Sequence, residues 1–327
     1  GRGPETAALI EASYETPARF VPLDATRQAE IESLLRRERP DLVLQCASLT
    51  NPWTILAGDA PGIARLRAAG VALQLPSMLP IALAAARAAR EVGRGMFVNL
   101  SWPDAVNVIL GRLGLAPEVG LGNATMMASR VRAALRRHAL ESADRGAAPP
   151  LVRVIGGANA LWNVLAATPP EDPVNGCRVY LGEDGRRGDE WAYKGPPLAS
   201  GSEINELTCA SSVAILPALL PGGPAIRASC PGVRGLYGGY PVRVAGGAVS
   251  FDLPPGVTID EAVGFNESCA ERDGIERIER DGTVVYTESA RAMVRDIDPV
   301  LTEPLVPNEA AERFPRLTAA IERCRAG

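Results

Sequence analysis

The sequence predicts an α/β protein, with a parallel sheet and helical crossovers in residues 1–148 and an α+β domain in residues 149–327. In the first half, short apolar runs alternate with stretches whose apolar residues recur every three to four positions. In the second half, segments rich in glycine and proline separate several strand-like runs. A chain of 327 residues is long enough for two domains, because single cores stop growing at roughly 250 to 300 residues.

The first predicted unit is a strand, a helix and a second strand within residues 19–48. Residues 19–23 are expected to form the first strand, and Asp24 or Thr26 is placed to cap the helix. The second strand, 42–47, is almost continuously apolar, which is typical of a sheet covered on both faces. The crossover is just long enough for parallel pairing.

The rest of the first half continues this alternation of helices and strands. An alanine-rich helix leads through two glycines into a strand, and a long arginine-rich helix closes the half. We expect helices at 77–92, 104–113 and 125–140, and strands at 96–100 and 117–121.

The sequence pattern changes after residue 150, where a predicted strand is followed by a long polar loop over 169–202. Connections of that length are seldom mere linkers. An Asp-Gly pair at 281–282 predicts a hairpin turn. We expect strands at 152–157, 239–244, 249–253, 275–278 and 283–286, and helices at 203–219 and 259–272.

Composition excludes several classes of function. A net charge of -4 and a pI near 5.4 give no indication of a basic surface that would bind nucleic acid. No run approaches the roughly 18 uninterrupted apolar residues of a membrane span, so we expect no membrane partner. The six cysteines form no CxxC pair and no secretory signal is visible, which predicts a cytoplasmic protein with reduced thiols.

The chain contains one histidine, His138, and one lysine, Lys194. A serine-histidine-aspartate triad or a histidine-rich metal site would have only His138 to use. His138 lies among arginines near the end of a predicted helix, where a solvated position is expected. The sequence therefore predicts no metal site.

Ligands of alternating α/β sheets bind beyond the carboxyl ends of the strands. Two such ends carry small and polar residues, in CASLTNPW (46–53) and NLSWPD (99–104). The fingerprint GxGxxG, which would seat a pyrophosphate, is absent, and the Gly pair of GRGPET (1–6) is expected to form a turn. The candidate cofactor-binding residues are Cys46, Ala47, Ser48, Asn99, Ser101 and Asn123.

The stretch FVNLSWPDAVNVILGRLGLAPEVGLGN (97–123) carries a family resemblance. A strand, a Ser-x-Pro turn, a helix, a short strand, Gly-x-Gly-x-Asn and a long helix follow in an order that resembles the middle of the lactate/malate dehydrogenase family. VIGGANALWNVL resembles that family's segment around its catalytic histidine, and GLYGGYPVRVAGGAVSFDLP resembles its substrate-domain sheet. The resemblance covers residues 40–295 and implies a Rossmann-like domain that binds NAD or NADP, followed by a substrate and dimerisation domain.

The resemblance also implies that this chain lacks the family's first strands and glycine-rich loop. The position of the family's catalytic histidine falls on Ala158 or Asn159, which do no acid-base work. The turn asparagine falls on Trp102, and the positions of the aspartate and of the substrate-binding arginine fall on Thr125 and Ala128. The carry-over of the family's catalytic residues therefore fails at the histidine.

A different group would have to supply the proton if the chain reduces a carbonyl. An imine substrate would need no separate donor, because an iminium accepts hydride directly. Ordinary structural roles compete with each candidate, such as a solvated loop for the lysine and packing for the tyrosine. The catalytic candidates are Lys194, Asn159 and Tyr240, and the substrate-binding candidates are Arg130, Asn163 and Glu206.

Two functions follow. The first is a divergent NAD(P)-dependent oxidoreductase that acts on a small polar carbonyl or imine. The second is a non-catalytic protein of the same fold that binds a metabolite or serves as a subunit, motivated by the missing glycine loop and histidine. A small molecule is the expected partner in both, and a homo-oligomer is compatible with either, since oligomers are common among such folds.

Overall fold

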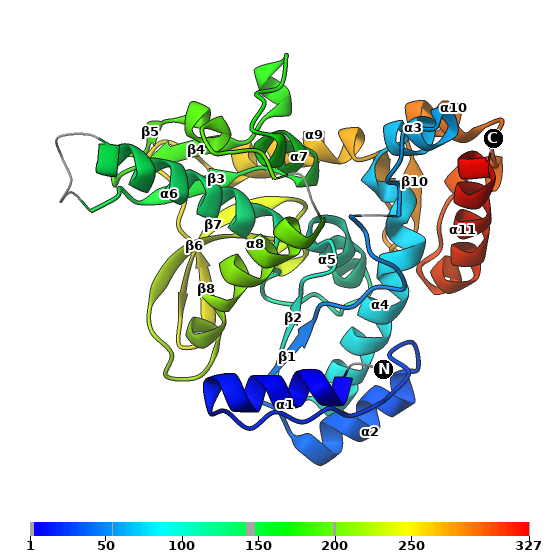
Figure 1. Cartoon of the computed structure of the whole chain (residues 1–327), viewed down its shortest axis with the longest axis horizontal. Coiled ribbons are helices and arrows are strands. Elements are labelled where there is room, and N and C mark those ends of the chain that lie inside the picture. The colour runs from blue at the N-terminus through cyan, green and yellow to red at the C-terminus, as the bar shows by residue number, and fades with distance from the viewer. Residues whose placement is uncertain (1–2, 54, 142–147, 199–200, 327) are drawn as a thin grey trace.

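The computed structural model describes residues 3–53, 55–141, 148–198 and 201–326, and it shows a mixed α/β protein in which helices predominate (Figure 1). The α-helices are α1 (Gly3–Tyr14), α2 (Gln28–Glu38), α3 (Pro61–Ala68), α4 (Leu75–Val92), α5 (Pro103–Arg112), α6 (Asn123–Glu141), α7 (Ala158–Ala166), α8 (Gly201–Val213), α9 (Ile259–Arg272), α10 (Glu288–Val294) and α11 (Ala310–Ala326). The strands are β1 (Leu42–Gln45), β2 (Met96–Asn99), β3 (Val152–Ile155), β4 (Arg178–Leu181), β5 (Arg186–Arg187), β6 (Ile226–Pro231), β7 (Gly239–Ala245), β8 (Ala248–Phe251), β9 (Ile275–Ile278) and β10 (Val284–Tyr286). Short 3₁₀ helices are η1 (Val71–Gln74), η2 (Pro173–Asn175), η3 (Asp189–Tyr193), η4 (Leu216–Leu219), η5 (Val233–Gly235), η6 (Pro299–Thr302) and η7 (Pro307–Glu309).

The parallel sheet consists of two strands in the described part of the chain. β1 pairs with β2 in parallel, with Gln45 opposite Asn99 at the end of the ladder. The expected strand at 117–121 contributes only a single bridge, from Gly120 to Asn99. The backbone amide of Gly120 donates to the carbonyl of Pro231 at 2.9 Å, which joins this segment to β6. The described chain therefore shows one parallel pair of strands, and a larger Rossmann-like sheet stays a prediction.

The strand expected at 19–23 is wrong, because this segment pairs with no strand of the described chain. Pro22 lies in its middle and has no amide hydrogen for a ladder. The helix that follows is confirmed as α2, although its N-cap residue is Arg27 and its side chain makes no capping bond. Gly1 and Arg2 of the expected N-terminal turn lie outside the described residues, and Gly3 begins α1.

Three antiparallel sheets make up the second half of the chain. Their strand orders are β6-β7-β8, β3-β4-β5 and β10-β9. A bridge between Gly156 and Gly239 joins β3 to β7. The expected hairpin turn is confirmed, because Asp281 accepts from the amide of Thr283 and Gly282 has a φ of +84°. Within the long loop predicted over 169–202 lie β4, β5 and η3.

Helix α4 is deeply buried in the first half of the chain. Its alanines let α2 approach closely, with Ala85 and Ala88 packed in one cluster with Ile31 and Leu35. α11 packs on it as well (Figure 1). The stretch Val71–Val92 is long and apolar enough to cross a membrane, but 83% of its most apolar window is buried inside the protein, as expected for a core helix.

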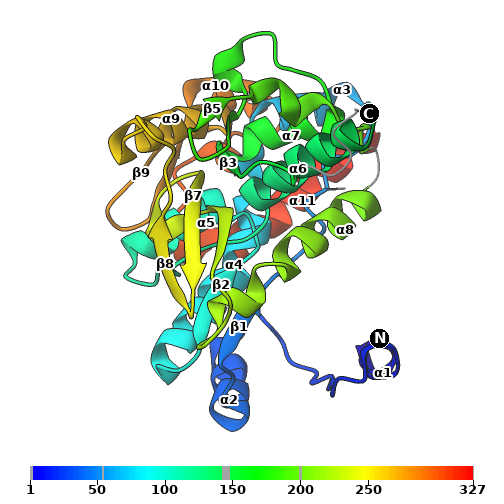
Figure 2. The same cartoon turned by 90° about the vertical axis from the view of Figure 1, so that its left-hand side faces the viewer.

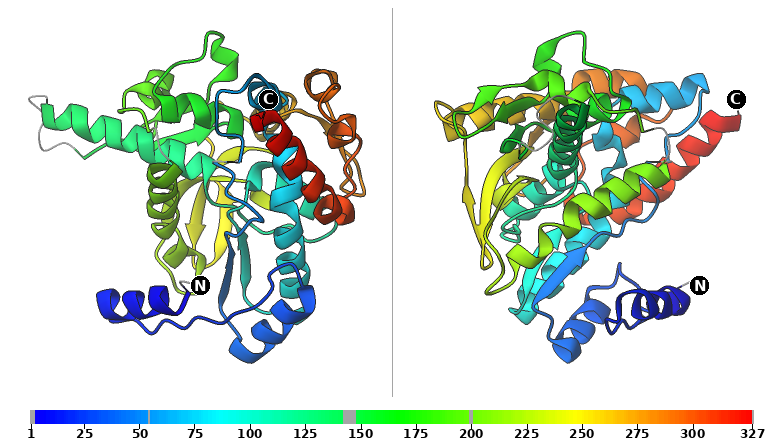
Figure 3. Two further views of the ribbon diagram at one scale, coloured as in Figure 1. Left: turned by 45° about the vertical axis from the view of Figure 1, so that its right-hand side comes forward. Right: turned by 60° about the vertical axis from the view of Figure 1, so that its left-hand side comes forward.

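The largest apolar core contains residues from both halves of the chain, including Leu79 and Ile109 from the first and Tyr240 and Leu317 from the second. The division at residues 148 and 149 therefore stays a prediction. α1 differs from the other helices, since it has no buried residue. Figures 2 and 3 show it set apart from the main body of the protein.

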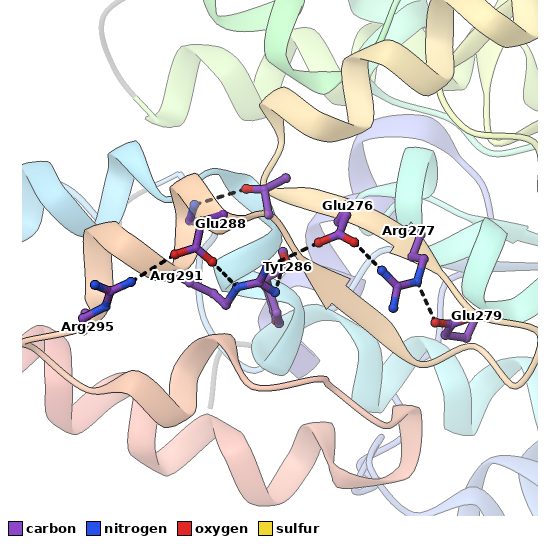
Figure 4. Close-up of polar contacts among 9 residues, drawn as sticks. Glu276, Arg277, Glu279, Tyr286, Glu288, Arg291 and Arg295 are labelled. Atoms are coloured by element: carbon purple, nitrogen blue, oxygen red, sulfur yellow. Dashed lines mark hydrogen bonds and ion pairs between the residues drawn. The ribbon is translucent and has the colours of Figure 1, made fainter.

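A chain of ion pairs covers β9, β10 and α10 on the surface (Figure 4). Arg291 contacts both Glu276 and Glu288, and Arg295 extends the series from Glu288 at 3.0 Å. Arg277 adds a further pair with Glu276. Exposed pairs of this kind contribute about 0–1 kcal/mol each, so they organise the surface more than they stabilise the fold.

Candidate ligand-binding site

A cavity of about 260 Å³ lies beyond the carboxyl ends of β1 and β2. The chain that leaves each strand forms one wall, and the other walls come from η1, the start of α4, the first turn of α6, the helix α7 and one face of α8. This is the edge of the sheet where α/β proteins hold their ligands. The cavity is lined by Cys46, Ser48, Pro52, Trp53, Val71, Gln74, Met78, Leu100, Ser101, Trp102, Gly122, Asn123, Met126, Ala158, Leu161, Trp162, Asn205, Thr208 and Cys209.

Three of the four tryptophans in the chain line this tryptophan-walled pocket. Trp53 and Trp162 meet edge to face, with ring centroids 5.4 Å apart and an angle of 76° between their planes. Trp162 remains 41% exposed, so its ring is open to an approaching molecule. Indole rings offer a large flat apolar surface at a low cost in side-chain entropy.

Trp102 holds an unusual backbone conformation at the start of α5. Its φ of 39° lies in the left-handed region, which costs a residue with a side chain about 1–2 kcal/mol. Pro103, the first residue of α5, follows it directly. The side chain of Trp102 is buried, and its indole Nε1 has no hydrogen-bond partner in the described structure. Strained residues of this kind cluster at functional sites.

Gln74 places a matching acceptor in the same cavity. It belongs to η1 and is 5% exposed, and its Oε1 also has no hydrogen-bond partner among the described residues. Two lining residues thus carry one buried donor and one buried acceptor without a partner among the described residues. A buried polar group without a partner costs about 1–3 kcal/mol, so these two atoms are poised for hydrogen bonds to a ligand.

The lining carries no charged side chain: none of the lining residues is Asp, Glu, Lys, Arg or His. Its polar side-chain groups are amides, hydroxyls, thiols and indole N–H groups. A ligand with a full charge would lose its hydration without gaining an ion pair, which is unfavourable. The pocket therefore suits an uncharged molecule.

A buried acid lies directly behind the pocket. Asp104, in the first turn of α5, is 0% exposed, and its Oδ2 accepts from Nδ2 of Asn123 at 2.5 Å. Its other oxygen, Oδ1, has no partner in the described structure. Burial raises the pKa of Asp104 to about 7, while the hydrogen bond from Asn123 acts in the opposite direction. This carboxyl can therefore hold or release a proton near neutral pH, one side chain away from the pocket.

A second buried acid, Asp273, follows α9 in the other half of the chain. Its Oδ2 accepts from the hydroxyl of Tyr237 at 2.5 Å. Burial raises the pKa of Asp273 to about 8, the bond from Tyr237 lowers it, and the charge of Asp104 raises it. Because like charges in a buried setting oppose one another, the two carboxyls are not both fully ionised at neutral pH.

Cys46 and Cys209 contribute two thiols to the pocket wall. Cys46 is exposed as a residue, but the partial removal of its thiol from water raises the thiol pKa above its ordinary value, and Cys209 raises it further. The reactive form of cysteine is the thiolate, so Cys46 is a weak nucleophile at neutral pH. Its position at the end of β1 fits a role in shaping the cavity better than one in covalent chemistry.

The structure brings four of the six predicted cofactor-binding residues together in this pocket: Cys46, Ser48, Ser101 and Asn123. The other two lie outside its lining. Ala47 is exposed beside it. Asn99 is fully buried, where its Nδ2 donates to Asn107 at 2.9 Å and to the carbonyl of Ser101, so that it shapes the turn after β2.

The three predicted catalytic residues do not line the pocket. Lys194 is exposed, and its Nζ lies 3.8 Å from the ring centroid of Trp191, an electrostatic contact with the ring face. Asn159 is half-buried in the first turn of α7. Tyr240 is 0% exposed, and its hydroxyl donates to the carbonyl of Tyr237 at 2.8 Å.

The three predicted substrate-binding residues also lie outside the lining. Arg130 is buried and donates to the carbonyls of Pro196 and Val164, which joins α6 to the loop before α8. Asn163 is half-buried near the end of α7, and Glu206 is exposed on α8. Of the predicted asparagines Asn99, Asn123, Asn159 and Asn163, only Asn123 lines the pocket.

Sequence reasoning missed the tryptophans, Gln74 and Asp104 as site residues. Trp53 and Asp104 end the two strand exits that the sequence does indicate, so position alone could have identified them. Gln74 gives no such signal, because it follows neither strand and enters the cavity only through the packing of η1.

No group of three or more histidine, cysteine, aspartate or glutamate side chains is arranged to hold a metal ion in the described part of the chain. No protein-family model, curated protein or solved structure matches the sequence or the fold. The geometry of the pocket is therefore the basis for assigning a function.

Proposed function

We propose that the tryptophan-walled pocket binds a small uncharged metabolite with a flat or ring-shaped apolar face. The observation that carries this proposal is the pair of buried, unpartnered polar atoms, Trp102 Nε1 and Gln74 Oε1, in a cavity without charged lining. A ligand that supplies one acceptor and one donor would satisfy both atoms. Its ring would pack against Trp162 or Trp53.

The size of the cavity bounds the ligand. Pockets for drug-sized molecules have about 300–1,000 Å³, and this cavity of about 260 Å³ falls just below that range. The occupant is thus a small metabolite or one end of a larger molecule. A primary amide or a hydroxyl-bearing ring has the required donor and acceptor close together.

Tryptophan fluorescence tests the proposal directly, because three of the four emitters line the pocket. The uncharged probes are nicotinamide, adenosine and methyl β-D-glucopyranoside, with malate as the charged comparison. We expect a saturable change with at least one uncharged probe and none with malate. Flat titrations with all three uncharged probes to about 10 mM, a concentration that corresponds to negligible affinity, would overturn the proposal.

Two variants locate the response. Trp162→Ala removes an exposed ring of the pocket and should abolish the change. Trp191→Phe removes the tryptophan outside the lining and should preserve it. An unchanged response in Trp162→Ala would place binding elsewhere.

A second candidate is a divergent NAD(P)-dependent oxidoreductase that acts on a small carbonyl or imine. The position of the pocket favours it, because Rossmann-like sheets hold nucleotides beyond their parallel strand ends. In this proposal β1 and β2 belong to a Rossmann-like sheet, and Asp104 supplies a proton reservoir behind Asn123.

The described residues fit the two ends of such a cofactor unequally. A nicotinamide carboxamide offers the acceptor and donor that Trp102 and Gln74 lack. The pyrophosphate has no counterpart, because no cation lines the pocket and the chain has no GxGxxG loop. This mismatch is why metabolite binding is the first proposal.

Thermal unfolding in the presence of NADH, NADPH or nicotinamide separates the two candidates. Stabilisation by nicotinamide alone would favour the metabolite-binding protein, and a larger shift with either dinucleotide would favour the oxidoreductase. No shift with NADH or NADPH at millimolar concentration would end the oxidoreductase proposal.

A further inference from the structure

A second hollow, of about 320 Å³, lies between α6, α8 and β6. Figure 2 shows α8 running beside α6. The hollow is distinct from the tryptophan-walled pocket, because it is lined by different residues of both helices. Thr125, Ser129 and Arg132 line it from α6, at a spacing of three to four residues that keeps them on one helical face.

Arg132 is the unusual member of this lining. It is half-buried, and its guanidinium makes no hydrogen bond or ion pair with any residue that the structure describes. Other arginines of the chain are engaged: Arg130 donates to backbone carbonyls, and Arg291 in Figure 4 contacts two glutamates. A guanidinium that is partly removed from water without a partner is costly, and an anion would offset that cost.

The charges around Arg132 also favour an anion. Burial lowers the pKa of the Arg132 guanidinium, the Cys230 thiol opposes this, and the positive Arg136 one turn later lowers it further. No aspartate or glutamate lines the hollow. The second arginine in the lining, Arg227, already contacts Glu183 and Asp252.

Four residues with hydroxyl side chains line the same hollow as Arg132. Thr125 and Ser211 lie 3.2 Å apart between their oxygens, and Ser229 accepts from the amide of Val154. Ser129 lies three residues before Arg132 on the same helical face, and its hydroxyl has no hydrogen-bond partner among the described residues. Its hydroxyl is therefore available as a donor.

We propose that this hollow binds a phosphate group, carried by inorganic phosphate or by a phosphate monoester, with Arg132 as its cation and Ser129 as a hydroxyl donor. The planar fork of a guanidinium matches two oxygens of a phosphate. Hydroxyls donate to the remaining oxygens without adding charge. The site does not depend on what the tryptophan-walled pocket binds.

Thermal unfolding of the full chain tests this site, with inorganic phosphate and glycerol 2-phosphate as separate probes and sodium chloride keeping the ionic strength constant. We expect a saturable rise in the melting temperature of the wild type. A rise with inorganic phosphate alone would identify the free ion, and a stronger response to glycerol 2-phosphate would identify a monoester. No saturable rise with either probe would overturn the proposal.

Matched arginine variants localise the effect. Arg132→Gln should weaken phosphate binding about tenfold or more, as expected when a hydrogen bond to a charged group is lost. Arg136→Gln, an exposed control one turn along the same helix, should weaken it by less than about threefold. Equal binding by Arg132→Gln and the wild type would overturn the proposal.

Two milder changes keep the test decisive if Arg132→Gln fails to fold. Ser129→Ala should weaken binding about twofold to tenfold without altering the melting temperature in chloride. Arg132→Lys keeps the charge but loses the planar fork, so it should also bind more weakly than the wild type. Unchanged affinity in both variants would contradict the assignment.

Discussion

The side-chain amide of Asn123 lies between the tryptophan-walled pocket and the carboxyl of Asp104, to which its Nδ2 donates at 2.5 Å. The two residues occupy the first turns of α6 and α5. A position at a helix N-terminus favours an ionised carboxyl by about 0.3–1 kcal/mol. The effect of burial is nevertheless larger than this stabilisation, and it raises the pKa of Asp104 to about 7. Asn123 therefore links the pocket to an acid whose charge varies around neutral pH.

Asp104→Asn should change how the free energy of unfolding depends on pH. In the folded protein Asp104 keeps its proton up to about pH 7, whereas the unfolded chain releases it near pH 3.8. The folded state therefore binds more protons between these values, and stability falls as pH rises, by up to about 1.4 kcal/mol per pH unit. Asparagine cannot ionise, so the variant should gain stability relative to the wild type across this range.

Urea unfolding at several pH values between about 5 and 8 measures this difference. Asp59→Asn, at an exposed aspartate, is the control and should leave the slope unchanged. Asp273, whose pKa is raised to about 8, keeps part of the slope in Asp104→Asn. Parallel curves for Asp104→Asn and the wild type would refute the predicted ionisation.

Gln74→Met should stabilise the protein while impairing the pocket. Methionine has a similar volume and removes the buried Oε1 that has no partner in the described structure. Removing such an atom should raise the free energy of unfolding by about 1 kcal/mol. The same change should abolish the fluorescence response to uncharged probes. Destabilisation by Gln74→Met would show that Gln74 has a structural role instead.

Alkylation of Cys46 should be slow at neutral pH. Burial raises the pKa of its thiol, so the fraction of reactive thiolate is small and should grow about tenfold per pH unit to beyond pH 9. Mass spectrometry of the Cys46 peptide after timed exposure to iodoacetamide gives the rate. In urea the rate should level off at lower pH. Identical profiles in folded and unfolded protein would contradict the prediction.

Gly239→Ala should destabilise the fold where β7, β3 and α6 meet. A Cβ at this position would lie 2.3 Å from the Cβ of Ala124 and 3.0 Å from the carbonyl oxygen of Gly156. Overpacking of this kind costs about 1–3 kcal/mol. Urea unfolding measures the loss.

Gly264→Ala is the matched comparison for that experiment. Gly264 is exposed within α9, and a Cβ there would meet nothing within 4 Å. Because alanine favours a helix over glycine by about 1 kcal/mol, this variant should be more stable than the wild type. Equal effects of the two substitutions would show that packing does not distinguish the sites.

Local signals predicted the regular elements well. The apolar periodicity of residues 28–38 and the run at 42–45 locate α2 and β1, because each pattern reflects burial of one face. The strand expected at 117–121 is wrong as a full strand, since the amide of Gly120 bonds to Pro231, more than a hundred residues later. Such pairings depend on the whole fold, so the local sequence does not predict them.

The site was predictable only where it follows a strand end. Ser48 and Ser101 come directly after β1 and β2, so topology places them at the pocket. Lys194 was a candidate because it is the single lysine of the sequence, but its side chain contacts Trp191 outside the pocket. Arg130 was a candidate as well, but its guanidinium donates to backbone carbonyls. The resemblance to lactate/malate dehydrogenases, the NAD(P) cofactor and the homo-oligomer remain predictions.

Lys194, exposed above Trp191 and outside the pocket lining, carries the only ε-amino group in the sequence. Apart from a free α-amino terminus, amine-reactive dyes would therefore label only the Lys194 side chain within residues 1–327, outside the tryptophan-walled pocket. Within residues 1–327, an enzyme that acylates or ubiquitinates lysine side chains therefore has Lys194 as its single acceptor.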